Sequence, residues 1–183
     1  MDIQILTARL HLRPYTHDDL DALHRLWTDP DVRRYLLDDE VVARGFVANE
    51  IKETRALFET HGFGQFAIRR KGEDALIGFI GYRFFHDPPE LQLIYGIAPA
   101  YWGRGLAPEA ARAMIRFGFE ACGLDDVVAA TDPPNKASLR VMEKAGLTFQ
   151  KRIIIDGLDT IYYSIAREDF EPDDTFYRLT PAG

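Results

Sequence analysis

The stretch YWGRGLAPEAA, residues 101–111, places a Gly-x-Gly turn between the strand-like run LQLIYGIA and a predicted helix. Gly103 and Gly105 allow backbone conformations that a Cβ atom would forbid, so successive amide N–H groups can turn toward one point. Pro108 suits the first position of a helix, whose positive dipole end adds about 0.3–1 kcal/mol for a nearby anion. Strand, glycine turn and helix N-terminus together predict a pyrophosphate site.

Two other interpretations of the glycine turn stay open on composition alone. The turn could be a plain helix entrance that happens to use glycine. It could also be a dinucleotide-binding fingerprint, which needs a third glycine where this chain has Pro108. That fingerprint also needs an acidic residue about 20 residues further on. Asp132 follows Gly103 by about 29 residues, so the spacing disfavours a dinucleotide.

A second polar pair lies in NKAS, at the predicted start of the next helix. Asn135 and Ser138 are three residues apart, so both side chains project from the first turn of that helix. Taken alone, they are helix-capping residues. Combined with the glycine turn, they form part of a recognisable arrangement.

Other chemistry has weaker support in this chain. The five histidines show no metal-ligand spacing, so no metal site is expected. Cys122 is the single cysteine, which excludes an internal disulfide and a thiolate metal cluster. Its place near a predicted helix end favours packing over nucleophilic chemistry.

Composition sets the broad class of the protein. A chain of 183 residues with 46% hydrophobic and 28% charged residues is typical of one globular domain. The net charge of −7 argues against a nucleic-acid partner and leaves room for a cationic substrate. The N-terminal residues contain no apolar run that predicts a signal peptide or a membrane span, so we expect a cytoplasmic protein without a membrane partner.

The elements that must position these residues follow from hydrophobic periodicity. RLHLRPY predicts a strand that ends at Pro14, and Thr16 then caps a helix that stops at Asp29 and Pro30. Residues 41–59 predict a second long helix. FGQFAIRR and ALIGFIGYRFF predict a hairpin, and LQLIYGIA predicts a third strand with a bulge at Gly96.

The remaining elements alternate between helix and strand. Residues 108–122 predict a helix, DVVAAT a strand, and NKASLRVMEKAGL a helix that ends at Gly146. TFQKRIIID and DTIYYSIA predict a closing hairpin around Gly157. The order predicts an α+β fold, with helices flanking one mixed, mostly antiparallel sheet in a single domain over residues 1–183. The acidic tail from about residue 167 is expected to be loosely packed unless its aromatic residues dock it.

Six segments in order over about 140 residues resemble the GNAT acetyltransferase superfamily, in particular the branch with the ribosomal-protein-alanine N-acetyltransferases. These segments are TARLHLRPYTHDDLDAL, DPDVRRYL, HGFGQFAI, LIGFIGY, IYGIAPAYWGRGLAPEAA and NKASLRVMEKAGLTF. The resemblance implies a fold in which LQLIYGIA splays away from DVVAAT. It also implies that acetyl-CoA lies in the gap between these two strands.

The resemblance further implies how acetyl-CoA is bound. The pantetheine amides would pair with the open backbone around Ile97 and Ala98, and Asn135 and Ser138 would approach the pantetheine and the thioester. The pyrophosphate would meet the amides of five consecutive residues: Gly103, Arg104, Gly105, Leu106 and Ala107. Trp102 stands where the superfamily usually has Gln or Arg, so the Arg104 side chain is expected to reach a phosphate instead.

The implied reaction is direct attack of a primary amine on the thioester. The backbone N–H of Ile97 or Ala98 is the candidate oxyanion donor. Many members protonate the leaving thiolate with a tyrosine seven residues after the asparagine. That position is Met142 here, which cannot donate, so Ser138 is the expected substitute.

The general base is less clearly defined by the resemblance. A glutamate would be expected three residues before Tyr95, and this chain has Gln92. Glu90 lies two residues earlier on the same strand face and could act directly or through water, although a solvent-facing carboxylate is an equal alternative. The acidic segment LLDDE, residues 36–40, falls where family members shape the acceptor pocket, although solvated surface charge is the simpler interpretation.

The pKa of the acceptor bears on how strong a base is needed. Deprotonating a lysine side chain of pKa about 10.4 at pH 7 costs roughly 4.6 kcal/mol, whereas an α-amine needs only about 1–1.4 kcal/mol. A weak base therefore favours a protein N-terminus or a small amine as the acceptor. We expect a monomer or a homodimer. The rival hypothesis, motivated by Gln92 and Met142, is a regulatory CoA-binding module with little or no turnover.

Overall fold

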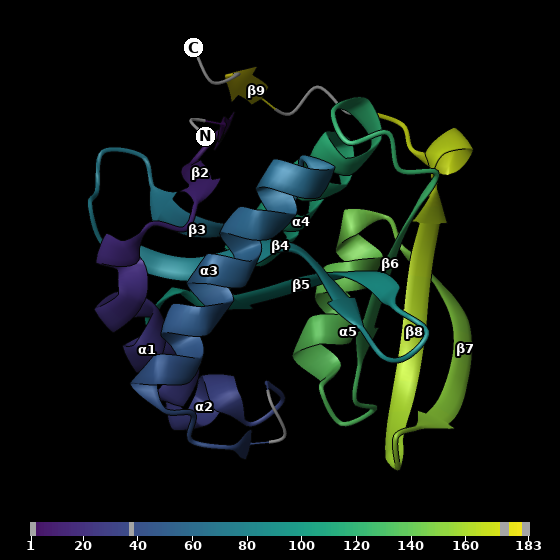
Figure 1. Cartoon of the computed structure of the whole chain (residues 1–183). Coiled ribbons are helices and arrows are strands. Elements are labelled where there is room, and N and C mark those ends of the chain that lie inside the picture. Colours follow the sequence, from purple (N-terminus) through teal and green to yellow (C-terminus); the bar gives the residue numbers. More distant parts are fainter. Residues whose placement is uncertain (1–2, 37–38, 173–175, 181–183) are drawn as a thin grey trace.

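The computed structural model describes residues 3–36, 39–172 and 176–180, and one nine-stranded sheet forms its centre (Figure 1). The strands in chain order are β1 (Gln4–Thr7), β2 (Leu10–Pro14), β3 (Gln65–Arg70), β4 (Leu76–Phe85), β5 (Glu90–Ile97), β6 (Asp126–Thr131), β7 (Thr148–Ile155), β8 (Leu158–Ala166) and β9 (Tyr177–Thr180). Their order across the sheet is β7-β8-β6-β5-β4-β3-β2-β1-β9. Neighbouring strands are antiparallel except β5 and β6, which run parallel. This is the mixed, mostly antiparallel α+β sheet that the sequence predicted.

Helices cover both faces of the sheet. The helices of the described residues are α1 (Leu20–Thr28), α2 (Pro30–Arg33), α3 (Arg44–His61), α4 (Leu106–Glu120) and α5 (Lys136–Ala145). On one face, Trp27 of α1 and Val47 of α3 pack with Phe79 of β4. On the other face, Met114 of α4 and Met142 of α5 belong to the larger core cluster. None of the helices described is long and apolar enough to span a bilayer.

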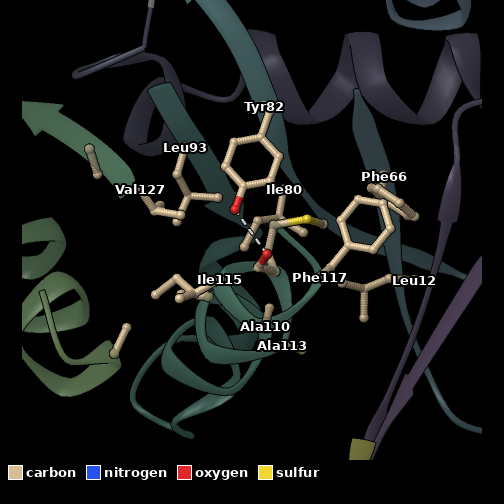
Figure 2. Packing of buried hydrophobic residues seen from close by; sticks show 14 of the residues in the cluster. Leu12, Phe66, Ile80, Tyr82, Leu93, Ala110, Ala113, Ile115, Phe117 and Val127 are labelled. Carbon is tan, nitrogen blue, oxygen red and sulfur yellow. Dashed lines mark hydrogen bonds between the residues drawn. The ribbon is translucent and has the colours of Figure 1, made fainter. Parts of the chain in front are cut away.

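Buried aromatic contacts fix α4 on the sheet (Figure 2). The rings of Phe117 on α4 and Phe66 on β3 meet edge to face, with their centroids 5.5 Å apart. The hydroxyl of Tyr82, which is 1% exposed, donates a hydrogen bond of 2.9 Å to the carbonyl oxygen of Met114. A buried tyrosine needs such a partner, and a helix carbonyl supplies it here. These contacts fix the place of the α4 N-terminus, where the glycine turn ends.

The N-terminal predictions agree with the structure to within a few residues. The first predicted strand ends at Pro14, and Asp19 accepts a hydrogen bond of 2.8 Å from the backbone N–H of Thr16, which fixes the start of the helical segment. Helix α1 stops at Thr28, before Asp29 and Pro30. The second long helix covers residues 44–61 rather than 41–59.

Strands β5 and β6 separate almost from their first contact. Their parallel pairing consists of Gln92 opposite Val128. By contrast, β6 pairs with β8 along its whole length, from Asp126 to Thr131. The predicted splay between LQLIYGIA and DVVAAT is therefore confirmed. It leaves the second half of β5 with an edge that no neighbouring strand covers.

Of the two alternatives for the tail, the described part shows the docked one, in which aromatic residues pack against the domain. Strand β9 pairs with β1 from Gln4 opposite Thr180 to Thr7 opposite Tyr177. Phe170 packs against Phe119, with a ring separation of 5.4 Å. Residues 173–175 and 181–183 lie outside the described residues. Strands β1 and β9 are both short, and neither was predicted because each needs the other as a partner.

Two local predictions around β5 and α4 also need correction. Gly96 forms no bulge, since the register of β4 and β5 runs on without a shift through Phe79 opposite Gly96. The glycine is needed because a Cβ there would lie 2.5 Å from the Phe79 ring. Helix α4 begins at Leu106, so Pro108 is its third residue and not its first. Proline is tolerated there because the first N–H groups of a helix have no partner within it.

Candidate functional site

A cavity of about 570 Å³ opens where β5 and β6 separate. Its walls come from the end of β5, the glycine turn, the first turns of α4 and α5, and α2. Predicted site residues among its lining are Ile97, Gly103, Gly105, Leu106, Ala107, Asn135 and Ser138. The sequence therefore identified residues from three separate segments that meet around one space.

The glycine turn, residues 103–105, forms one end of this cavity. Gly103 has φ 74° and Gly105 has φ 72°, both in the left-handed region that favours glycine. Helix α4 starts directly after Gly105, so the free N–H groups of its first turn lie beside those of the turn. Such a set of amides at a helix N-terminus suits an anion. This arrangement is the one predicted from YWGRGLAPEAA.

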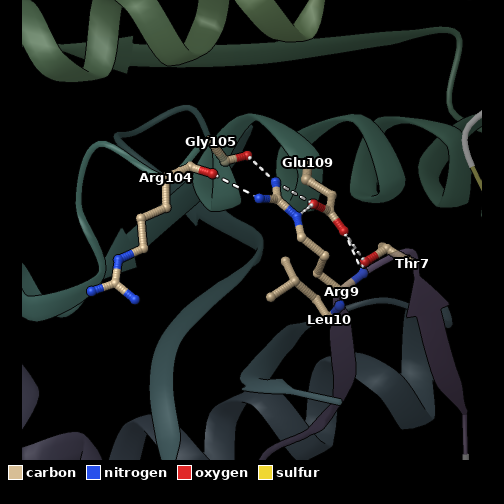
Figure 3. Close-up of polar contacts among 6 residues, drawn as sticks. All are labelled: Thr7, Arg9, Leu10, Arg104, Gly105 and Glu109. Carbon is tan, nitrogen blue, oxygen red and sulfur yellow. Dashed lines mark hydrogen bonds and ion pairs between the residues drawn. The ribbon is translucent and has the colours of Figure 1, made fainter.

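The outer side of the glycine turn is held by Arg9, from the connection between β1 and β2 (Figure 3). The Arg9 guanidinium donates to the carbonyl oxygens of Arg104, at 2.8 Å, and Gly105, at 3.1 Å. It also pairs with Glu109 on α4, at 2.6 Å. The Arg104 side chain points away from this contact and lies over the Tyr101 ring, 5.6 Å from its centroid.

The backbone of β5 offers one of the two predicted amide donors. The N–H of Ala98 donates to the carbonyl oxygen of Ile77 at 2.8 Å, so it points to β4 and is already used. Successive residues of a strand present their backbone groups to opposite edges. The N–H of Ile97 therefore faces the gap, where the Trp102 ring N–H binds the Ile97 carbonyl oxygen at 2.6 Å. Of the two candidate oxyanion donors, only the Ile97 N–H therefore faces the gap.

The first turn of α5 places Ser138 in the lining of the same cavity. The Asn135 side chain accepts from the Ser138 N–H at 3.2 Å, as predicted for a helix cap, and donates to Thr131 at 3.0 Å. The hydroxyl of Tyr95 lies 2.8 Å from Ser138 Oγ and 3.1 Å from the Ser138 carbonyl oxygen. Burial raises the pKa of Tyr95 well above its usual value, so this hydroxyl stays protonated. Sequence analysis did not assign Tyr95 to the site.

Helix α5 also carries a positively charged wall that the sequence analysis missed. Lys136, Arg140 and Lys144 line the cavity. They are four residues apart, which places them on one face of the helix. The sequence NKASLRVMEK contains this spacing. Only the tertiary structure shows that this face of the helix borders a cavity. Three cations beside a set of backbone amides favour a ligand with several phosphates.

Glu90 and Gln92 do not line the cavity and belong to a separate group at the start of β5, which we call the hairpin cluster: His86, Glu90, Gln92, Asp156 and Tyr162. The Gln92 amide donates to Glu90 at 2.8 Å and lies 3.4 Å from His86 Nε2. Side chains of a strand alternate between faces, so these two leave β5 on the face opposite to Tyr95. Glu90 is thus not the isolated solvent-facing carboxylate of the alternative interpretation.

The hairpin cluster orients the His86 ring. Asp156 Oδ2 lies 3.0 Å from Nδ1, which favours the tautomer with its proton on Nδ1. Nε2 is then an acceptor, and the hydroxyl of Tyr162 lies 3.2 Å from it. Burial, followed by the Glu90 charge, raises the pKa of Tyr162. The arrangement is an imidazole held by a carboxylate at Nδ1, with Nε2 facing the Tyr162 hydroxyl and the Gln92 amide.

The cavity opens toward α2 on the remaining side. Its lining there includes Asp31, Arg34, Tyr35 and Leu36. Leu36 is the first residue of LLDDE, and the interpretation of that segment as part of an acceptor pocket stays a prediction. Residues 37–38 of that segment lie outside the described residues.

The remaining reactive side chains of the described residues have structural surroundings. Burial raises the pKa of the Cys122 thiol to about 12, which makes it a poor nucleophile. Met142, at the position where the resemblance led us to look for a tyrosine, is 2% exposed and packs in the core. Across the described ranges, no three His, Cys, Asp or Glu side chains gather closely enough to hold a metal ion.

Comparison with known sequences finds relatives along most of the chain. The family model described as acetyltransferase (GNAT) domain matches residues 9–148. YnaD of Bacillus subtilis, named an uncharacterized N-acetyltransferase, is 30% identical over 177 residues, which cover 92% of this chain and 99% of YnaD. The spermidine N(1)-acetyltransferase of Escherichia coli K12 is 28% identical over 148 residues, covering 78% of this chain and 75% of that enzyme.

Solved structures with the same fold include an acetyltransferase of the GNAT family from Bacillus anthracis. It has a TM-score of 0.75 and 27% identity, and the match covers 90% of this chain and 99% of that one. The ribosomal L7/L12 α-N-protein acetyltransferase RimL, crystallised with coenzyme A, has a TM-score of 0.73. Its identity is 15%, over 87% of this chain and 95% of that chain, so this second likeness concerns the fold alone.

Proposed function

Since this chain belongs to the GNAT acetyltransferase family and uses acetyl-CoA, we propose that it acetylates a primary amine by direct attack within a ternary complex. The acceptor we propose is a protein N-terminus or a small amine. The observation that carries the proposal is the cavity beside the separating strands β5 and β6, whose lining brings together the glycine turn, the first turn of α4 and Ser138. A ligand with a pyrophosphate at one end and a reactive group at the other fits this layout.

The residues of the cavity match the chemical groups of CoA. The amides from Gly103 to Ala107 would bind the pyrophosphate, and the cationic face of α5 would balance its charge. The N–H of Ile97 faces the gap, where it is available to a pantetheine carbonyl or to the reacting oxygen. Bound acetyl-CoA would supply the acetyl group as a thioester, whose acyl carbon a neutral amine can attack.

Ser138 is proposed to donate a proton to the departing sulfur. When Tyr95 donates to the Ser138 carbonyl oxygen, the Ser138 hydroxyl proton is available to another acceptor. A thiol has a pKa of about 8.5, far below that of either hydroxyl, so neither residue can remain ionised after giving up its proton. A primary ammonium loses two protons on becoming an amide: the first goes to a base before attack, and the second is lost as the N–C bond forms. Ser138 relays this second proton to the departing sulfur, and Tyr95 holds the serine in place.

Proton removal from the amine is assigned to the hairpin cluster. Glu90 and Gln92 leave β5 on the face opposite to Ser138, and His86 Nε2 is an acceptor beside them. None of these residues lines the cavity, so a proton would reach Glu90 or His86 through water. Such an indirect base suits an amine that loses its proton easily.

The acceptor class is supported by charge and by one relative. The net charge of −7 favours a cationic substrate. The relative from Escherichia coli is named for spermidine, a polyamine. The comparisons leave the acceptor of this chain open between a small amine and a peptide N-terminus.

Release of free thiol from acetyl-CoA tests the proposal. The purified chain is given acetyl-CoA with polyamines, α-amino peptides and lysine peptides whose N-termini are blocked. We expect thiol release above background with at least one amine, and faster turnover with α-amines than with blocked lysine peptides. Tight CoA binding without thiol release for any acceptor would instead favour the regulatory CoA-binding module.

A further inference from the structure

The connection between β1 and β2 touches the glycine turn through Arg9, which is not among the residues that line the cavity (Figure 3). Arg9 donates through Nη1 to the carbonyl oxygen of Arg104 and through Nη2 to that of Gly105, across about 95 residues of sequence. Gly105, Leu106 and Ala107 line the cavity, whereas Arg9 does not. Arg9 therefore contacts the turn without forming part of the cavity lining.

Peptide planarity converts these two contacts into a statement about amides. In a trans peptide unit the C=O and the N–H point in opposite directions. The Arg104 carbonyl shares its peptide unit with the N–H of Gly105, and the Gly105 carbonyl shares its unit with the N–H of Leu106. Holding both oxygens on Arg9 therefore directs both N–H groups away from Arg9.

The glycine turn needs an external constraint of this kind. Gly103 and Gly105 flank the Arg104 peptide, and glycine adopts positive and negative φ with similar ease. Local sequence therefore leaves the direction of the Arg104 peptide unit open, whereas the Gly105 carbonyl also accepts from the Glu109 N–H at 3.4 Å as α4 begins. The guanidinium is planar and presents its donors in a fixed fork, so it can hold two adjacent carbonyls at once.

The fork is itself fixed by Glu109, in the first turns of α4. Glu109 accepts from Arg9 Nε at 2.6 Å and from the Arg9 backbone N–H at 2.9 Å. It also accepts from the Thr7 hydroxyl at 2.6 Å, and Thr7 Oγ1 accepts from the Leu10 N–H at 2.9 Å. The carboxylate is 14% exposed although Arg9 is half exposed. The Thr7 hydroxyl and the Arg9 backbone N–H hold the Glu109 carboxylate in place, and the carboxylate in turn holds the guanidinium.

We propose that Arg9 is a positioning residue for the donor site, which aims the N–H groups of Gly105 and Leu106 at the phosphates of CoA. Arg9 does not touch the ligand. The inference rests on the proposed function only in taking CoA as the ligand of the cavity. Its consequence is specific: loss of Arg9 weakens recognition of the pyrophosphate and leaves recognition of the acceptor unchanged.

The decisive comparison uses acetyl-CoA and S-acetyl-pantetheine, which lacks the phosphates. For Arg9→Ala we expect KM for acetyl-CoA to rise about 10- to 30-fold, with kcat within about twofold and KM for S-acetyl-pantetheine unchanged. Arg9→Lys keeps the charge but not the fork, and we expect most of the same rise. Thr7→Val removes one hydrogen bond to Glu109 and should raise KM for acetyl-CoA two- to threefold.

The matched control is Arg152→Ala. Arg152 also pairs with a carboxylate through Nε at the surface, where Asp159 accepts at 2.9 Å, but it lies on β7 far along the sheet from the glycine turn. We expect the Tm of Arg152→Ala to fall by about as much as that of Arg9→Ala. Its KM for acetyl-CoA should stay at the wild-type value. The inference is overturned if Arg9→Lys and Arg9→Ala keep wild-type KM, or if S-acetyl-pantetheine is affected equally.

Calorimetric titration with CoA alone separates this inference from the proposed function. If no amine is acetylated, the proposed reaction fails, yet the positioning role still requires weaker CoA binding in Arg9→Lys than in the wild type. Equal affinities in that titration would overturn the inference, whether or not the chain turns over. If Arg9→Ala does not fold, Arg9→Lys and Thr7→Val carry the test.

Discussion

The glycine turn and the hairpin cluster lie at opposite ends of β5 and are built in different ways. The turn uses backbone amides from consecutive residues, and Arg9 holds it from outside the cavity. The hairpin cluster uses side chains from the β4–β5 connection, β5, the β7–β8 turn and β8. A backbone site is sensitive to any added side chain, whereas a cluster of several polar side chains can lose one member and keep part of its function. The glycine turn should therefore respond more strongly to single substitutions than the hairpin cluster.

The largest effect is expected from Gly103→Asp. A carboxylate about 4 Å from a phosphate costs about 4 kcal/mol at an effective dielectric of about 20, which corresponds to roughly a thousand-fold loss of CoA affinity. Calorimetric titration with CoA measures it. Gly72→Asp is the matched control, because Gly72 has φ 77° against 74° at Gly103 and a Cβ meets nothing within 4 Å at either position. If both variants bind CoA like the wild type, the phosphates do not lie at the glycine turn.

A smaller effect is expected at Ser138 and Tyr95. Ser138→Ala should lower kcat roughly 100-fold, in the range for a lost proton-transfer group. Tyr95→Phe should lower it about fivefold, since one neutral hydrogen bond is lost. KM for acetyl-CoA should change little in either variant. Tyr163→Phe is the control, because Tyr163 also bonds to α5, through Glu143 at 3.2 Å, without lining the cavity. A wild-type kcat in Ser138→Ala would remove the serine from the mechanism.

The smallest effect is expected at the hairpin cluster. Glu90→Gln and His86→Gln should each lower kcat/KM for an α-amino peptide less than about fivefold, because that amine needs only about 1–1.4 kcal/mol to lose its proton at pH 7. For a lysine side chain the loss should be larger, roughly tenfold or more. Without the base, the reaction depends on amine that is already neutral in solution. The acid limb of kcat/KM against pH should therefore move to higher pH.

A carboxylate outside the hairpin cluster provides the control for that experiment. Glu73 lies in the β3–β4 turn and pairs with Arg70 at 2.7 Å. Glu73→Gln should leave the rate and the pH profile unchanged. Equal rates for wild type, Glu90→Gln and His86→Gln with every amine would show that solvent alone takes up the proton. If Glu90→Gln or His86→Gln lowered kcat as much as Ser138→Ala, the hairpin cluster would not be the less sensitive of the two regions.

The glycine turn and the Asn135 cap could be predicted from sequence because each depends on contacts within a few residues. The turn conformations depend on glycines at fixed spacing, and the Asn135 cap depends on one side chain and an amide three residues later. The family resemblance then linked these two segments across about 30 residues. Tyr95 was missed because its hydroxyl reaches Ser138 only after β5 and α5 pack together. Arg9 was missed because it touches the turn across about 95 residues.

The sequence by itself determined the α+β class, most element boundaries, the glycine turn and the α5 cap, since each follows from periodicity or from contacts within a few residues. Only the tertiary structure decided which β5 amide is open, because strand pairing directs the Ala98 N–H to β4 and leaves that of Ile97 facing the gap. It also decided that the tail adds β9 to the sheet and that His86 joins Glu90 and Gln92. These features depend on which distant segments meet, and a single sequence does not encode that in any local pattern.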